Sequence, residues 1–299
     1  MTVLRPYRPR QSVQRAVLYM LIAAITLPGL SACGKYLSDY PISQVTWARY
    51  AGHFAFMILV FAPRNGLGIL RSARPGLQLA RSGLHCASSA LFFAGIAALS
   101  LSTATAIFFS GPILVTALAP FLLKERLGPG KVAAAGVGFA GTLVVIRPGW
   151  TVEYLAVSLV IASAVASALF QILSRKLAEH DRPLTSNTYM VLVGFVLMTL
   201  PLPVVWRTPV ASLDIFVFLL IGVLGGIGHY FLVRAFEMAP AAFLSPFNYA
   251  QIIGATALGY LLFGQLPDLW TWVGAAIIAL SGTFLLLSER SRTRVVEKA

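Results

Sequence analysis

Long apolar stretches, separated by short polar segments, make up most of this chain. An apolar run of roughly 20 residues is long enough to cross a bilayer as a helix. The sequence therefore predicts an all-α polytopic membrane protein with short connections and no separate soluble domain. We place its ten transmembrane helices at residues 14–34, 41–62, 82–99, 103–122, 131–147, 153–175, 187–206, 213–234, 240–263 and 268–288.

The composition agrees with a membrane location. Hydrophobic residues make up 58% of the 299 residues and charged residues 11%, and the mean hydropathy is +0.81. This is too little polar surface to cover a soluble protein of that length. The interval from Leu84 to Leu123 has no Lys, Arg, Asp or Glu and is too long for one span, so we predict a turn at the small hydroxyl residues of 100–105.

The basic residues indicate the orientation. Most of the 23 Lys and Arg residues lie before the first span, between the second and third, after the fourth and sixth, or after the tenth. These segments share one side of the membrane, and the positive-inside rule makes that side, with both termini, cytoplasmic. The net charge of +13 is thus a topology signal, and we expect no nucleic-acid partner because the charges form no compact platform.

The two halves of the chain are weakly similar. At an offset of about 140 residues, "GKYL" (34–37) aligns with "SRKL" (174–177) and "FLLKERL" (121–127) with "YLLFGQL" (260–266). Five spans per half make the second copy enter the membrane from the opposite side, which gives an inverted repeat. We expect a cytoplasmic tail at 1–13, a first repeat at 14–149, an inverted second repeat at 150–288 and a cytoplasmic tail at 289–299.

Three features carry a resemblance to a known family. They are Arg49 in "TWARY", the segment 110–149 beginning "SGPILVTALAPFLLKERLGPGK", and the segment 244–286 beginning "LSPFNYAQIIGATALGYLLFGQLPD". With the duplicated layout, the chain resembles the EamA branch of the drug/metabolite transporter superfamily, and within it the YddG-type aromatic amino-acid exporters of bacteria. The resemblance covers nearly the whole chain. It implies a multi-pass protein of the bacterial inner membrane that exports small metabolites through a central cavity by alternating access.

Polar residues on four spans predict that cavity. At the 100° rotation per residue of a helix, each set falls on one face; in the ninth span this face includes Asn248 and Tyr249, and Gln251 lies just off its edge. Polar groups that face lipid cost several kcal/mol. The alternative is that the small residues only allow close helix packing, but the bulky Asn248, Tyr249 and Gln251 do not serve that purpose. The other faces comprise His85, Ser88, Ser89 and Phe92 in the third span, Thr105, Phe108, Phe109 and Pro112 in the fourth, and Ser163, Ser167, Phe170 and Ser174 in the sixth.

Tyr249 is the strongest single candidate for substrate contact. Arg49 could bind a substrate carboxylate with two hydrogen bonds, but we favour a bracing role near the outer interface. For His229 we favour packing. The full candidate set for substrate binding is Tyr249, Asn248, His85, Ser89, Phe92, Ser163, Ser245, Gln251, Tyr230 and Arg49.

Three prolines are candidate bends or hinges. Pro246, Pro112 and Pro28 lie inside predicted spans, where proline removes a helical hydrogen bond and frees a carbonyl. Such breaks at membrane depth are tolerated where protein or water satisfies the backbone. We interpret them as bends that open the cavity, with simple shape-fitting as the alternative.

The spans contain no embedded carboxylate, and this bears on coupling. Proton-coupled and cation-exporting transporters usually carry a buried Asp or Glu, so we expect facilitated export of aromatic and other neutral amino acids. The alternative is a proton-coupled exporter of cationic drugs, with His85 as the proton carrier. An intramembrane lipid-modifying enzyme is disfavoured because its reactive groups are missing, a sensor because soluble domains are missing, and sugar-phosphate exchange because only Arg49 is available.

Other motifs are interpreted as incidental. "LSACG" (30–34) looks like a lipoprotein cleavage site at Cys33, but cleavage would leave one repeat incomplete. Cys33 and Cys86 lie in apolar spans, so we expect no disulfide and no metal site. "GPGKVAAAGVG" (128–138) lacks the spacing of a nucleotide-binding loop. We expect no cofactor, a small-molecule substrate, and a monomer in the bilayer, because one chain completes the pseudo-symmetric unit.

Overall fold

The computed structural model describes residues 11–66, 70–122, 128–147, 153–177, 180–239 and 241–296. This part of the chain contains twelve α-helices and no strand. The helices are α1 (Gln11–Tyr36), α2 (Ile42–Asn65), α3 (Pro75–Ile96), α4 (Leu101–Phe108), α5 (Gly111–Leu122), α6 (Pro129–Ile146), α7 (Tyr154–Leu177), α8 (Pro183–Thr199), α9 (Leu202–Val205), α10 (Ser212–Met238), α11 (Ala241–Phe263) and α12 (Leu269–Val296). Of the predicted tails, residues 1–10 and 297–299 lie outside the described residues, whereas 289–296 continue α12.

Two of the predicted spans contain two helices each. In the fourth span, α4 ends at Phe108 and α5 begins at Gly111. The N–H of Phe109 donates to the carbonyl of Thr105 at 3.0 Å, and the N–H of Ile113 donates to the carbonyl of Ser110 at 2.9 Å. Pro112 therefore lies in the first turn of α5, where a missing N–H costs nothing. In the seventh span, the short α9 follows α8.

The start of α4 lies at the predicted turn. Ser100 precedes the helix, and its Oγ accepts a hydrogen bond from the N–H of Thr103 at 3.2 Å. This is the usual N-cap contact of a serine. By contrast, α1 runs through Pro28 and α11 through Pro246 without a break in the helix.

Within the described residues, five helical segments are long and apolar enough to cross a membrane, judged by length and composition. They are Val13–Tyr36, Leu101–Leu122, Pro129–Ile146, Tyr154–Leu177 and Ser212–Phe236. Two shorter apolar helices, Pro183–Thr199 and Leu269–Leu285, accompany them.

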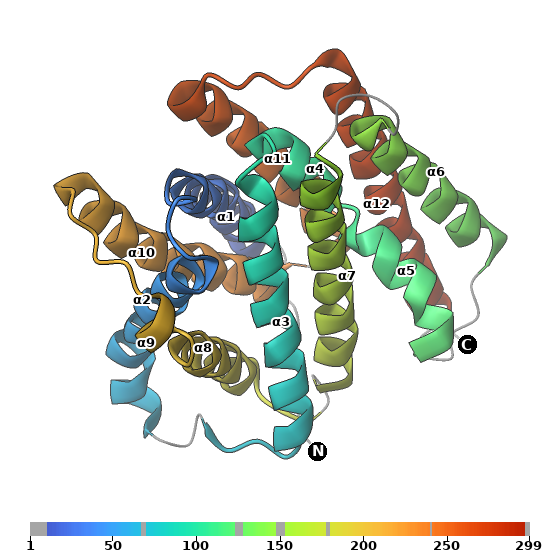
Figure 1. Ribbon diagram of the computed structural model, residues 1–299. Coiled ribbons are helices and arrows are strands. Elements are labelled where there is room, and N and C mark those ends of the chain that lie inside the picture. The colour runs from blue at the N-terminus through green and yellow to red at the C-terminus, as the bar shows by residue number, and fades with distance from the viewer. Residues whose placement is uncertain are drawn as a thin grey trace.

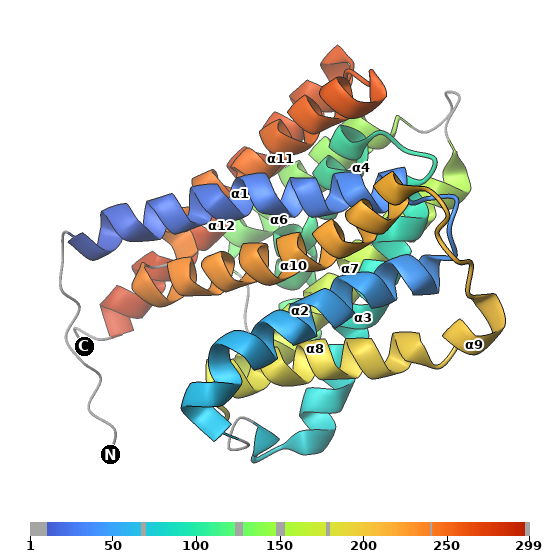
Figure 2. The ribbon, with the colours of Figure 1, turned by 90° about the vertical axis from the view of Figure 1, so that its left-hand side faces the viewer.

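The helices of the first half of the chain pack mainly against those of the second half. Helix α1 packs on α10 and α11, α2 on α10 and α8, α3 on α7 and α8, and α6 on α12. Figure 1 shows α3 beside α7, and Figure 2 shows α1, α10, α2 and α8 lying one beside the next. Helix α1 begins and α12 ends on the same side of the bundle (Figure 2).

Glycines allow two of these helix pairs to touch through their backbones. A Cβ placed on Gly52 of α2 would lie 2.4 Å from the Cα of Gly222 in α10. A Cβ on Gly274 of α12 would lie 2.6 Å from the carbonyl oxygen of Gly141 in α6. Small residues at such crossings let membrane helices approach closely and gain van der Waals contact.

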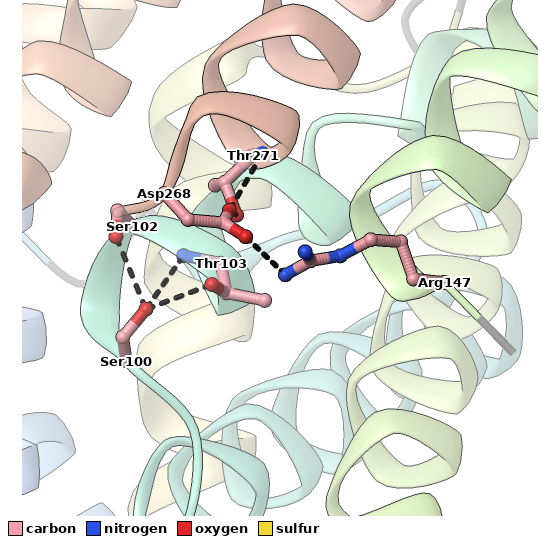
Figure 3. A network of polar contacts seen from close by, with 6 residues as sticks. All are labelled: Ser100, Ser102, Thr103, Arg147, Asp268 and Thr271. Carbon is pink, nitrogen blue, oxygen red and sulfur yellow. Dashed lines mark hydrogen bonds and ion pairs between the residues drawn. The ribbon is translucent and has the colours of Figure 1, made fainter. Parts of the chain in front are cut away.

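An ion pair joins the end of α6 to the start of α12 (Figure 3). Arg147, in a left-handed conformation with φ of 47°, pairs with the carboxylate of Asp268. Asp268 also accepts hydrogen bonds from the backbone N–H and the hydroxyl of Thr271, at 2.9 and 2.8 Å. Desolvation alone would raise the pKa of Asp268, but the Thr271 hydrogen bonds and the Arg147 charge lower it overall.

Candidate functional site

A central cavity of about 600 Å³ lies between the helices of both halves. This volume is within the range of pockets that hold small metabolites, about 300–1,000 Å³. Side chains of α1, α3, α4, α5, α7, α8, α10 and α11 line it, together with Arg49 of α2. The aromatic part of its wall consists of Phe92, Phe93, Phe108, Phe109, Phe170 and Phe236.

The aromatic rings contact one another around the cavity. The rings of Phe92 and Phe108 meet edge to face with centroids 5.2 Å apart, and Phe108 meets Phe109 at 6.4 Å. The ring of Phe170 lies 4.8 Å from that of His85. Phenylalanine rings offer apolar faces for stacking, so this wall suits a planar aromatic group.

Arg49 lies in the interior of the bundle. Only 6% of the residue is exposed, and its terminal nitrogens donate to the Oγ of Ser89 and contact Nε2 of His229 at 3.3 Å. The hydroxyl of Tyr50 lies 2.7 Å from Nδ1 of His85 and 3.1 Å from the Oγ of Ser89. This network joins α2, α3 and α10. Arg49 thus contacts neighbouring helices in the bundle interior and also reaches the cavity, while its bracing role stays a prediction.

Arg81 is a second buried cation on the cavity wall, and the sequence reasoning missed it. It is 7% exposed, Nε donates to the Oγ of Ser174 at 2.6 Å, and Nη1 donates to the carbonyl of Ser186 at 2.9 Å. Its guanidinium lies 4.4 Å from the centroid of the Phe170 ring. We predicted a span that begins at residue 82, but α3 begins at Pro75, so Arg81 belongs to the helix. Arg81 precedes His85 by four residues, and residues four apart lie on the same face of a helix, so the sequence did contain a signal that Arg81 faces the cavity.

Asp181 lies at one end of the cavity, in the connection between α7 and α8. Its carboxylate accepts hydrogen bonds from Ser72 Oγ at 2.5 Å, from the N–H of Ala73 at 2.8 Å and from Gln78 Nε2 at 2.8 Å. Desolvation alone would raise the pKa of Asp181, but these three hydrogen bonds lower it overall. The group is therefore ionised at neutral pH. The carboxylate is in a loop, as predicted, yet it lines the cavity.

Two amide side chains of α11 face the cavity one helical turn apart. Gln251 Nε2 donates to Asn248 Oδ1 at 2.6 Å. Among the described residues, the Asn248 amino group and the Gln251 carbonyl oxygen have no further partner. If both amides were flipped, the free groups would exchange places, but one donor group and one acceptor would remain. The pair therefore presents a donor and an acceptor side by side.

The structure brings together most, but not all, of the predicted site residues. The cavity wall includes Asn248, His85, Ser89, Phe92, Gln251 and Arg49, and also Pro28 and Pro112. Ser245 and Pro246 lie in the backbone of α11, but their side chains fall outside the described part of the structure.

Three predicted residues do not line the cavity. The Tyr249 hydroxyl is buried, has no partner among the described residues, and occupies the space beside Gly282 of α12. Ser163 Oγ donates to the carbonyl of Ser88 at 2.6 Å, which ties α7 to α3. The ring of Tyr230 packs against Phe231 with centroids 5.3 Å apart. Tyr249 and Ser163 thus contact the neighbouring helices α12 and α3, and the ring of Tyr230 also lies 6.1 Å from that of Phe56 in α2.

The described part of the chain contains no cluster of three or more His, Cys, Asp or Glu placed to hold a metal ion. Cys33 and Cys86 are buried free thiols.

These features define the class of protein. Apolar helices long enough to span a bilayer surround an aromatic and polar cavity to which both halves contribute, which is the architecture of a small-molecule membrane transporter. The sequence profile of the EamA-like transporter family matches residues 14–147 and again 154–288. The chain belongs to this family and is a multi-pass membrane transporter of the drug/metabolite transporter superfamily.

Individual relatives extend over almost the full chain. A riboflavin transporter of Rhizobium johnstonii is 29% identical over 286 residues, which is 93% of this chain and 92% of the relative. An S-adenosylmethionine uptake transporter of Rickettsia conorii is 25% identical, over 91% of this chain and 92% of the relative. A protein of known crystal structure has a TM-score of 0.63 at 21% identity, covering 93% of this chain and 98% of that one, and so shares the fold.

The comparisons confirm one part of the expected resemblance. Membership of the EamA-like family is shown, and the relatives are named as transporters, not as enzymes. Their names, riboflavin and S-adenosylmethionine transporters, do not support the narrower resemblance to aromatic amino-acid exporters.

Proposed function

We propose that the protein carries a planar heteroaromatic metabolite, with riboflavin as the first candidate, across the bacterial inner membrane through the central cavity. The observation that carries this proposal is the Asn248–Gln251 amide pair, which shares the cavity with several phenylalanine rings. The name of the Rhizobium johnstonii relative supports the same substrate.

The chemistry of the flavin ring fits this wall. One edge of the ring presents alternating carbonyl and N–H groups, and its faces are flat and apolar. The free amino group and free carbonyl of the amide pair are complementary to one neighbouring acceptor and donor on that edge. Phenylalanine faces stack on the ring system. A purely apolar substrate would leave the amide groups unpaired, at a cost of about 1–3 kcal/mol each.

The proposed transport cycle is alternating access between two inverted five-helix repeats, at 14–149 and 150–288, with ten spans and cytoplasmic termini. Two observations support this arrangement. The family profile matches the chain twice, and the start of α1 and the end of α12 lie on the same side of the bundle (Figure 2). The cavity lining extends to Asp181 and Pro183, whereas Tyr40 and Asp214 at the other end take no part in it. On this topology the cavity extends toward the cytoplasmic end of the bundle.

No tightly bound driving ion enters this proposal. Asp181 is the one carboxylate among the described cavity residues, and three hydrogen-bond donors already occupy its oxygens. The direction of net movement then follows the substrate gradient. The alternative of a proton-coupled cation exporter would need either a free carboxylate in this wall or proton transfer by His85, whose Nδ1 lies 2.7 Å from the Tyr50 hydroxyl.

A second candidate is the aromatic amino-acid export expected from the sequence. The observation that favours it is the Arg49 guanidinium at the same cavity as the phenylalanine rings. A guanidinium binds a carboxylate with directed hydrogen bonds, and the rings would hold an aromatic side chain.

The test is counterflow in proteoliposomes that contain the purified protein, with labelled riboflavin, tryptophan, S-adenosylmethionine and a cationic dye, with and without a pH gradient. Riboflavin should exchange without the gradient, and the rate should fall at least tenfold in Asn248→Leu and Gln251→Leu. Thr256→Val is the matched control, since Thr256 is a buried residue of the same helix outside the cavity wall. Exchange of tryptophan but not riboflavin would support the second candidate, and flux that requires the pH gradient would refute passive transport.

A further inference from the structure

The cavity wall carries more positive than negative charge. Arg49 and Arg81 both line it, and Asp181 is the one carboxylate among its described residues. A guanidinium stays protonated in proteins. Within the described part of the chain, neither arginine lies within 4.0 Å of a carboxylate oxygen. Two largely buried cations therefore share this cavity without a paired anion, which is an unfavourable arrangement until an anion arrives.

Asp181 does not neutralise Arg81, because an amide side chain separates them. Gln78 Nε2 donates to the Asp181 carboxylate at 2.8 Å, and Gln78 Oε1 accepts from Arg81 Nη1 at 3.5 Å. Ser72 and Ala73 supply the other donors to Asp181. The carboxylate is thus held among neutral donors, and the guanidinium keeps its charge available to the cavity.

Arg81 has a free donor group. Its Nε and Nη1 atoms make the hydrogen bonds to Ser174, Ser186 and Gln78, whereas Nη2 has no partner among the described residues. Nη2 is not completely buried, and Arg81 lines the cavity, so this donor group is available on the cavity wall. The contact with the Phe170 ring fixes the plane of the guanidinium. Arg49 differs, since both of its terminal nitrogens are engaged and its free Nε is sealed from solvent.

We propose that Arg81 is an anion-binding subsite, at which Nη2 holds a carboxylate or phosphate group of the substrate while the substrate's aromatic ring lies against the phenylalanine wall. Arg49 contributes positive potential deeper in the cavity. The cavity then favours aromatic anions over neutral molecules, and neutral molecules over cations. This inference rests on the proposed function only in taking the central cavity as the substrate path.

The test measures binding by calorimetry to the detergent-purified protein at neutral pH. The ligands are 3-phenylpropionate, 3-phenylpropanol and 3-phenylpropylamine, which share one ring and chain length but differ in charge. The acid should bind at least tenfold more tightly than the amine, with the alcohol between them. Riboflavin and flavin mononucleotide form a second pair, a neutral flavin and its phosphorylated form. This pair tests whether Arg81 binds a phosphate group, as the acid tests whether it binds a carboxylate.

The variants separate charge from structure. Arg81→Gln should weaken binding of the acid at least tenfold while leaving the alcohol within twofold, and Arg81→Lys should keep the preference for the acid. Arg74→Gln is the control, because Arg74 is an exposed arginine that immediately precedes the same helix and lies outside the cavity wall. Equal binding of acid and amine would overturn the proposal. So would an equal loss of acid and alcohol binding in Arg81→Gln, which would show that Arg81 only braces α3 against α7 and α8.

The two proposals fail in different ways. Preference for the acid without any flavin binding would refute the flavin substrate and support the subsite. Riboflavin counterflow without any preference for charge would support the flavin substrate and refute the anion-binding subsite.

Discussion

The hydroxyl of Tyr40 donates a 2.6 Å hydrogen bond to Oδ2 of Asp214, which lies 174 residues further along the chain. The hydroxyl of Tyr36 donates to the other carboxylate oxygen at 3.1 Å. The contact joins the connection after α1 to the first turn of α10. The hydrogen bond to Asp214, followed by desolvation and the Asp214 charge, raises the pKa of Tyr40 to about 12, so the phenol remains a donor at neutral pH. Asp181 makes a similar contact at the opposite end of the cavity, from the connection after α7 to Ser72 and Gln78.

Removing the Tyr40 hydrogen bond should make the cavity more accessible from that end. In Tyr40→Phe, a cysteine introduced as Ser31→Cys on the cavity wall should react faster with a membrane-impermeant maleimide applied from the Tyr40 side. The background would carry Cys33→Ala and Cys86→Ala. Tyr260→Phe, at an exposed tyrosine, should leave the rate unchanged. An unchanged rate in Tyr40→Phe would show that this contact does not restrain opening.

Asp181 should make stability depend on pH in the acid range. Its pKa in the folded protein lies below its ordinary value of about 3.9. The ionised carboxylate therefore stabilises the fold above that value, and the contribution is lost as the pH falls through the lowered folded pKa. Thermal unfolding in detergent should show a steep loss of stability below about pH 4, and Asp181→Asn should flatten it. Asp268→Asn, which removes a second lowered pKa, should flatten it independently.

The backbone contact between α2 and α10 should not accept a methyl group. Gly52→Ala places a carbon 2.4 Å from the Cα of Gly222, so one helix must shift. Overpacking of this kind costs roughly 1–3 kcal/mol, which should appear as a lower unfolding temperature. Gly83→Ala is the control within α3, since a Cβ there meets nothing within 4 Å, and it should be neutral or stabilising. Similar losses in both variants would contradict the close-contact argument.

Two buried tyrosines should respond differently to loss of their hydroxyl groups. The Tyr249 hydroxyl has no partner, so Tyr249→Phe should keep transport and leave stability unchanged or slightly higher. The Tyr50 hydroxyl contacts His85 and Ser89, so Tyr50→Phe should lose about 0.5–1.5 kcal/mol of stability. It should also slow transport by disturbing the Arg49 network. Abolished transport in Tyr249→Phe would restore Tyr249 as a substrate contact.

Hydrophobic pattern alone located the helices well, because length and apolar content are what a bilayer selects. It did not locate the interruption at Phe109 and Ser110, because the preceding residues remain apolar and only Pro112 marks it. The start of α3 was placed too late for a related reason. Arg81 made that turn look like a loop, although buried polar partners allow a cation inside a membrane protein.

The faces of individual helices were harder to predict. On α11 the polar pattern placed Asn248 and Tyr249 together and left Gln251 at the edge. In the structure Asn248 and Gln251 line the cavity, whereas Tyr249 and Thr256 lie outside its wall with buried hydroxyls that have no partner among the described residues. A sequence shows which helix face carries polar groups, but the neighbour that the face meets depends on tertiary packing. On α3 the pattern was sufficient, because His85, Ser88, Ser89 and Phe92 all line the cavity.

The packing of the first half against the second has a consequence for biosynthesis. During translation, α1, α3 and α6 enter the membrane before their main partners α10, α7 and α12 have been made. The early helices therefore wait in the bilayer with their contact faces unpaired, and α6 waits until the last helix of the chain is inserted. Assembly is thus completed at the end of synthesis. A chain whose translation stops before α12 lacks the main packing partner of α6.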